Sequence, residues 1–125
     1  MTFEQKRQNI IKALNMTGIT SPNIALDKDT IPRKFPAAIV VLQGEKGKNV
    51  TSHRYCEFEY YLAIFLIADV NNSKDPDQDI IKLASAFKET YRKIIGNDIS
   101  KIDYYPVRAD SGRKVRIAKV YQVTE

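Results

Sequence analysis

Residues 54–68 read RYCEFEYYLAIFLIA, and this run of aromatic and β-branched side chains decides the fold. Its second half, residues 62–67, is apolar on both faces of a strand, which indicates that other elements cover it there. Fifteen residues exceed the usual strand length of roughly 5–6, so the strand is expected to project beyond its own core. Its first half alternates between an apolar and an acidic face: Cys56, Phe58 and Tyr60 against Glu57 and Glu59.

The segments before this strand predict a helix, an irregular connection and a second strand. Residues 2–5 read TFEQ, a capping box that starts a helix ending near Gly18. The connection over residues 18–36 contains three prolines, and part of it is expected to pair as a short edge strand. Residues 37–43 are nearly all apolar and predict a strand, and a loop over residues 44–52 leads from it to the long strand.

A second helix is predicted after the long strand. Asp75 suits the N-cap, Pro76 fits the first helical position, and Gly96 suits the C-terminal end. Apolar residues between them recur at helical spacing and predict one buried face: Ile80, Leu83, Ala84, Phe87, Tyr91, Ile94 and Ile95.

The last segment predicts a β-hairpin, with strands over residues 102–108 and 113–123 and a turn over 109–112. One face of its second strand carries Val115, Ile117, Tyr121 and Val123, and only Lys119 interrupts that apolar row. The element order is therefore α-β-β-α-β-β. It predicts an α+β fold, a mostly antiparallel sheet of about four to five strands with two helices packed against it.

Composition limits the class of protein. With 125 residues and 14.3 kDa, the chain is expected to form a single domain over residues 1–125. No apolar run approaches the roughly 20 residues that span a bilayer, and the charges within residues 1–20 do not fit a signal peptide. No membrane partner is expected, and the chain is interpreted as cytoplasmic where it is made.

Motifs for chemistry are weak throughout the chain. One cysteine and one histidine cannot form a zinc site, and Cys56 and His53 are three residues apart on a strand, hence on opposite faces. No other cluster accompanies Glu57 and Glu59 as a metal site or acid–base pair. The aspartates of residues 75–79 lack the glycine of a calcium loop. The sequence therefore predicts no enzyme, no catalytic residue, no metal and no cofactor.

The net charge is +5, and the sequence pI is about 9.3. Basic residues gather in two places, residues 45–54 and residues 108–119. Neither group is interleaved with aromatics in the way of a base-stacking platform. A basic patch is expected, but not a surface that reads nucleic-acid sequence.

Five short sequence motifs occur in a defined order along the chain. They are FPA at 35–37, LQGE at 42–45, LAIFL at 62–66, RADSG at 108–112 and YQV at 121–123. With the two helices between them, their order and spacing resemble the tail terminator proteins of long-tailed bacteriophages, the lambda type above all. The resemblance covers about the whole chain. The basic composition here departs from the acidic lambda-type protein, which leaves the lumen charge and the docking partner open.

The resemblance implies a structural protein of a phage or prophage, without a catalytic site. Members of this family assemble as hexameric rings on the completed tail tube, stop its polymerisation and present a surface to the head connector. The implied partners are other copies of the chain, the tail tube protein and the head connector, with DNA only passing through a lumen. The implied location is the virion tail, and the host cytoplasm during assembly.

A ring needs an interface in which one patch meets a different patch of the neighbour. The long strand and the last hairpin offer sheet edges and mixed charge for this role, and the loop over residues 44–53 is expected to be disordered until docked. Two alternatives remain open: another head–tail joining or neck protein, and a small basic nucleic-acid-binding protein. The expected interface residues are Lys46, Lys48, His53, Arg54, Glu57, Glu59, Arg108, Asp110, Arg113 and Arg116.

Overall fold

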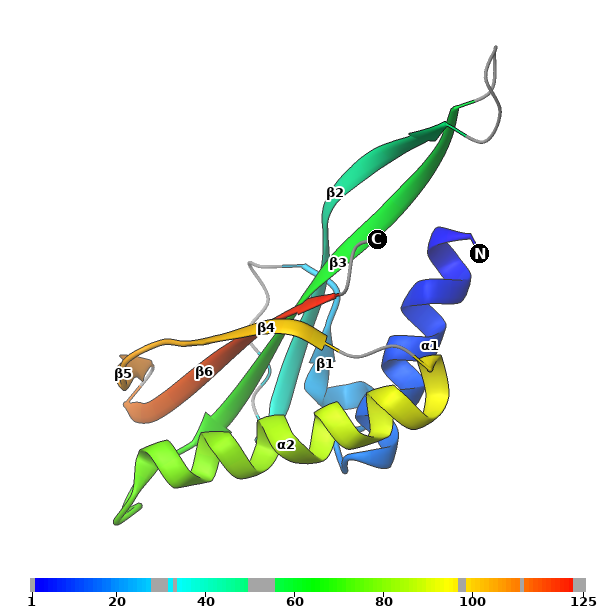
Figure 1. The fold of residues 1–125 in the computed structure, drawn as a ribbon. Helices are drawn as coiled ribbons and strands as arrows, with labels where there is room; N and C mark the ends of the chain where they lie inside the picture. The colour runs from blue at the N-terminus through cyan, green and yellow to red at the C-terminus, as the bar shows by residue number, and fades with distance from the viewer. Residues whose placement is uncertain are drawn as a thin grey trace.

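In the described part of the chain, two helices pack on one face of a six-stranded sheet, as Figure 1 shows for the computed structural model. The structure describes residues 2–27, 32, 34–49, 56–96, 99–110 and 112–122. For residues 46–49, 56–59, 110 and 122 it describes the backbone alone. The predicted α+β class is confirmed.

Helix α1 (Phe3–Met16) begins at the predicted capping box. The Thr2 hydroxyl accepts a hydrogen bond from the Gln5 backbone N–H at 3.1 Å, and the Gln5 side-chain oxygen accepts one from the Thr2 N–H at 2.9 Å. These two bonds satisfy N–H groups that have no partner inside the helix. Its inward face is apolar: Ile10, Ala13 and Leu14 are fully buried.

Helix α2 (Pro76–Ile95) also begins and ends where the sequence predicted. The Asp75 side chain accepts a hydrogen bond from the Gln78 backbone N–H at 3.1 Å, and Gly96 ends the helix with a left-handed φ of 82°. The predicted stripe is the helix's buried face, with Ile80, Ala84, Phe87 and Tyr91 in the core and Leu83, Ile94 and Ile95 packed against it.

The sheet has the strand order β1-β2-β3-β6-β4, and β5 pairs with the beginning of β6. A 3-10 turn at Ser21–Asn23 leads into β1, which pairs in parallel with β2 and confirms the expected short edge strand; all other pairs are antiparallel. The strands are β1 (Ile24–Ala25), β2 (Ala37–Asn49), β3 (Cys56–Asp69), β4 (Ile99–Tyr104), β5 (Arg108–Asp110) and β6 (Arg113–Gln122).

The predicted strand over residues 102–108 is in fact two strands, β4 and β5. Pro106 lies between them, and proline has no N–H to donate to a ladder. One backbone bond still ties the break to β6, because the Tyr105 N–H donates to the Ile117 carbonyl at 2.9 Å. The segment over residues 105–107 therefore runs beside β6 without belonging to the sheet.

Both faces of the sheet are apolar. The face under the helices carries alternate residues of β2, β3 and β6, which join the helices in one core: Ala38, Val40, Leu62, Ile64, Leu66, Ala118 and Val120. The opposite face carries Ala37, Ile39, Ile67 and Val115, with Phe35, Val41, Phe65 and Ile117 partly buried around them. The apolar row predicted for the last strand thus lies on the sheet face away from the helices. Val123, the last residue of that row, is outside the described residues.

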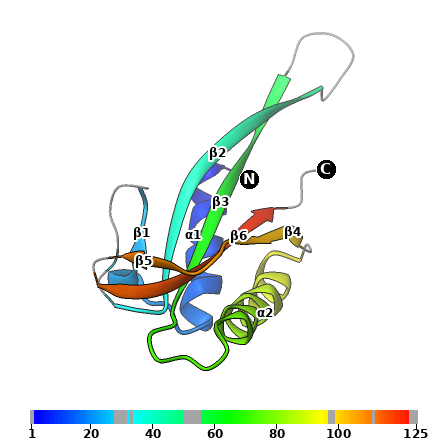
Figure 2. The same cartoon turned by 90° about the vertical axis from the view of Figure 1, so that its left-hand side faces the viewer.

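The β2–β3 pair continues well beyond the rest of the sheet, as Figures 1 and 2 show. Strand β6 pairs with β3 only from Ala63 onward, whereas β2 and β3 stay paired as far as Asn49 and Cys56. We call the two-stranded projection, residues 42–49 and 56–61, the arm. It is the predicted projection of the long strand, whose expected first residues 54 and 55 lie outside the described residues.

The arm corrects the prediction of a loop that is disordered until docked. Residues 44–49 belong to β2, and the rest of that expected loop, 50–53, lies outside the described residues. Two glycines and two lysines suggested a loop when read alone. Their pairing partners on β3 include strong strand formers, and the register sets Lys46 opposite Glu59 and Lys48 opposite Glu57.

Candidate assembly surfaces

The arm brings together four of the predicted interface residues by backbone register. The backbone register sets Lys46 of β2 opposite Glu59 of β3, and Lys48 opposite Glu57. Their side chains are not described. His53 and Arg54, the two other residues predicted here, lie outside the described residues.

A bulge at the base of the arm decides which side these residues occupy. Leu42 pairs with Leu62 and Gly44 with Tyr61, so Gln43 is an extra residue on β2. The Tyr61 ring lies over Gly44, where an added Cβ would meet it at 3.2 Å. Because strand faces alternate, the extra residue shifts β2 by one position and aligns Lys46 and Lys48 with the glutamates rather than with the apolar face of β3.

Helix α1 supports the arm at its base. The rings of Phe3 and Tyr60 meet edge to face with centroids 5.7 Å apart. The Lys6 ammonium donates to the Tyr60 carbonyl at 2.8 Å. The first turn of the helix therefore contacts β3 just beyond the last residue that β6 pairs with.

The predicted residues of the last hairpin fall into two groups. Arg113 and Arg116 have partners within the chain: Arg113 lies 3.6 Å from Asp69 and beneath the Phe35 ring at 5.7 Å, and Arg116 lies 2.7 Å from Asp77. Only 19% of the Arg116 side chain is exposed, so this arginine mainly joins β6 to the start of α2. Arg108 is exposed on β5, and Asp110 is described by its backbone alone.

A polar and aromatic cluster that the sequence did not predict lies on the sheet face opposite the helices. The Lys119 ammonium lies 4.7 Å from the centre of the Tyr121 ring and 5.7 Å from that of Phe65. The Tyr121 hydroxyl donates to Asp103 at 2.9 Å, and Lys101 lies 3.6 Å from the same carboxylate. Lys119, which interrupts an otherwise apolar row, was the sequence signal for this cluster.

The hydrogen bond to Asp103 raises the pKa of Tyr121 above its ordinary value of 10.0, because the bond favours the protonated phenol. Desolvation and the negative charge of Asp103 act in the same direction, and Lys101 acts against them. The raised pKa keeps the Tyr121 phenol protonated, and thus able to donate to Asp103, at neutral pH.

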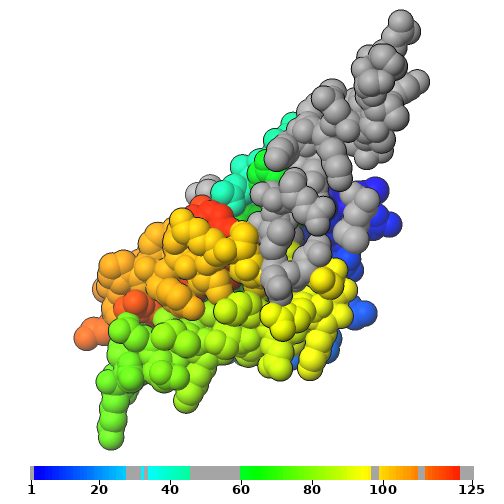
Figure 3. All heavy atoms as spheres, viewed as in Figure 1, coloured from blue at the N-terminus to red at the C-terminus, as the bar shows by residue number. Residues whose placement is uncertain are grey.

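Large apolar side chains are exposed at two separate places on the sheet. On the arm, Leu42 is 53% exposed. At the end of β4 and just after it, the exposed fractions are 41% for Tyr104, 39% for Tyr105 and 39% for Val107. This second segment follows the orange strand in Figure 1 and contributes to the orange surface in Figure 3. Tyrosine and arginine are enriched where proteins bind each other, and Arg108 follows directly.

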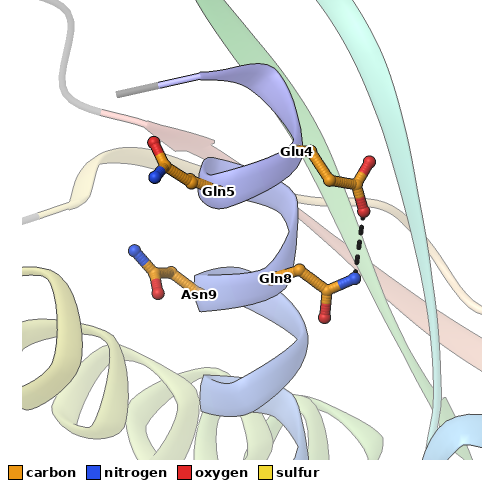
Figure 4. A pocket seen from close by; sticks show the side chains of 4 residues that line it. All are labelled: Glu4, Gln5, Gln8 and Asn9. Carbon is orange, nitrogen blue, oxygen red and sulfur yellow. Dashed lines mark hydrogen bonds between the residues drawn. The ribbon is translucent and has the colours of Figure 1, made fainter.

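An open depression lies beside the first turns of α1 (Figure 4), lined among the described residues by Glu4, Gln5, Gln8 and Asn9. The Gln8 amide donates to Glu4 at 3.0 Å, and Arg7 donates to it at 2.6 Å; both lower the pKa of the Glu4 carboxyl. A carboxylate kept charged in solvent is a poor proton donor at neutral pH. The depression is a polar helix face.

The described residues offer neither a metal site nor a membrane-spanning helix. Within the ranges given above, no group of three or more His, Cys, Asp or Glu side chains could hold a metal ion. None of the helices described is both long and apolar enough to cross a membrane.

The chain was also compared with known proteins. No protein-family model matches it, and no similar sequence was found among curated proteins.

Proposed function

We propose that this protein is a structural subunit of phage tail assembly, of the tail-terminator type. Copies form a ring on the finished tail tube, prevent further tube subunits from adding, and present a surface for the head connector. The sequence resemblance described above suggests this role, and the arm is the structural observation that supports it best.

Apart from the contacts of Tyr60 with α1, the arm contributes little to the fold of its own chain. Its described side chains, those of residues 42–45, 60 and 61, belong to neither apolar core cluster. An isolated two-stranded ribbon is marginally stable in water, so a projection of this length is favoured when another molecule covers it. A subunit whose arm reaches away from its own core is suited to contact a neighbour.

A ring also needs two different surfaces on each subunit. The arm and the segment over residues 104–108 provide exposed apolar side chains at separate positions on the sheet. When one patch meets the other on the next copy, the contact is head to tail, and such contacts close into rings when the rotation allows it.

The test is loss of the gene in the phage or prophage that carries it, followed by electron microscopy of the tails. Without a terminator, tubes of the major tail protein should exceed their normal length, and purified protein added to such tubes should form a ring at one end. Tails of normal length that fail to join heads would indicate a neck or head-joining protein instead.

The nucleic-acid alternative makes a different prediction. Binding through phosphate contacts weakens steeply as salt concentration rises. A duplex DNA titration at two salt concentrations therefore separates the alternatives: tight, salt-sensitive binding with no effect on tubes would contradict the proposal.

A further inference from the structure

Among the described residues, the outer edge of β2 has no neighbouring strand along most of its length. Strand β1 pairs with β2 only at Ala38 and Ile39, so no strand of the described chain pairs with that edge from Val40 to Asn49. Ten residues of free edge correspond to about 33 Å of strand. Free edges of this kind are templates for pairing with another chain.

The other strand of the arm is less available. At its base, Lys6 already donates to the Tyr60 carbonyl, and Phe3 packs on the Tyr60 ring. Helix α1 therefore occupies the region where β3 leaves the sheet, whereas the β2 edge lies on the other side of the ribbon. Between the two edges of the arm, β2 is the one open to a partner strand.

The sheet has a second open edge at its far end. Strand β4 is the last in the order, and among the described residues it pairs only with β6. Its six residues, about 20 Å of strand, can fit within the free part of β2. The two edges belong to opposite ends of the sheet, so they cannot meet within one copy.

The side chains beside the two edges are complementary. Leu42 lies on β2 and Tyr104 at the end of β4, both large, apolar and exposed, and both on the sheet face that carries the helices. A sheet that joins the two edges would bury this apolar pair together.

We propose that the outer edge of β2 in one copy pairs with the outer edge of β4 in a second copy, so that the sheet continues from subunit to subunit. This inference rests on the proposed function and names the strands that join neighbours in the ring. Because the two edges differ, each copy donates one and accepts one, and the contact repeats around the assembly.

The first test replaces one exposed apolar residue at each edge, Leu42→Lys and Tyr104→Lys. Each should raise the concentration for half-maximal self-association about tenfold or more, as measured by sedimentation velocity of the full-length protein. Met16→Lys and Ile81→Lys are the matched controls, since these residues are 57% and 41% exposed on the two helices. Unchanged association of both edge variants would overturn the proposal.

Mixing the two edge variants gives the decisive result. The arm of the Tyr104→Lys chain and the β4 edge of the Leu42→Lys chain are both intact, so a mixture should form one-to-one dimers with wild-type affinity. These dimers should not add further copies, because their free β2 edge carries Leu42→Lys and their free β4 edge carries Tyr104→Lys. A mixture that stays monomeric, or one that forms full rings, would overturn the proposal.

Tyr104→Ala covers the case in which Tyr104→Lys fails to fold, because it removes the exposed ring without adding a charge. It should also weaken self-association. Unchanged association of a folded Tyr104→Ala chain counts against the proposed pairing. Wild-type protein that stays monomeric at every concentration and on tail tubes also overturns it.

The outcomes separate this inference from the proposed function. If Leu42→Lys and Tyr104→Lys rings still form on tubes and cap them, the function stands and the strand pairing is wrong. If wild-type copies associate through these edges but tubes elongate unchecked, the pairing stands and the terminator function is wrong.

Discussion

The contact between α1 and the arm makes a quantitative prediction about Phe3 and Tyr60. Their rings meet edge to face at 5.7 Å, and the Arg7 guanidinium lies 5.1 Å from the centre of the Phe3 ring. Replacing Phe3 with alanine removes both contacts and the apolar area beneath them. The helix capping box, which uses Thr2 and Gln5, stays in place.

The expected cost follows from these contacts. An edge-to-face aromatic pair contributes about 0.5–1.5 kcal/mol beyond area burial, and an exposed cation–π contact about 0.5–1 kcal/mol. Phe3→Ala should therefore lower the free energy of unfolding by about 2 kcal/mol. In a chain of this size that corresponds to a fall in Tm of roughly 8 °C.

Urea denaturation of Phe3→Ala, Tyr60→Ala and the double variant measures the interaction itself. The double-mutant cycle should give a coupling energy of about 1 kcal/mol. Met16→Ala, at the other end of the same helix and 57% exposed, should change stability by less than about 0.5 kcal/mol. A coupling energy below about 0.3 kcal/mol would refute the idea that this ring pair fixes the arm to the body.

Three other predictions concern α2, the sheet and the core. Asp75→Ala removes the N-cap of α2 and should lower the free energy of unfolding, measured by urea denaturation, by about 1 kcal/mol. Asp75→Asn keeps a capping oxygen and should lose only a small part of that stability. The pKa of Tyr121, measured by NMR of labelled tyrosine, should lie above 10.0, and Asp103→Asn should lower it. Because the pKa is raised in the folded state, the hydrogen bond stabilises the fold below pH 10, and this stabilisation is lost as the pH rises through the folded-state pKa. A Tyr121 signal unmoved by Asp103→Asn would show that this hydrogen bond is not the cause. Phe87→Ala should lower the free energy of unfolding by about 3–5 kcal/mol because Phe87 is fully buried. Ile81→Ala, on the exposed side of the same helix, should lower it by less than about 0.5 kcal/mol. Equal losses would contradict the assigned orientation of α2.

Local signals predicted the helices closely, because their causes lie within a few residues. The Thr2–Gln5 capping box, the Asp75-Pro76 start and the Gly96 end all act over three or four positions, and each is present in the structure. The apolar stripe of α2 likewise needs only helical spacing to show its buried face.

Features that depend on strand pairing were harder to predict. Residues 44–49 are rich in glycine and lysine, and only the opposite strand makes them part of β2. The division of the last hairpin at Pro106 was missed although proline signals it, because the residues on both sides suit a strand.

Of the predicted interface residues, four on the arm are brought opposite one another by register, and Arg113 and Arg116 pair within the chain. The Tyr121 cluster joins β3, β4 and β6, so no single stretch of sequence contains it. Proximity across a sheet follows from topology, which residue patterns define only in outline.

The bulge at Gln43 has a consequence for how this protein can vary. Beyond the bulge, described arm side chains belong to neither core cluster, so the arm can lengthen without repacking the body. Adding two residues to each strand preserves the sides on which its side chains lie, whereas adding one to a single strand exchanges them. The length of the arm can therefore change in steps of two residues per strand while the core of the body stays the same.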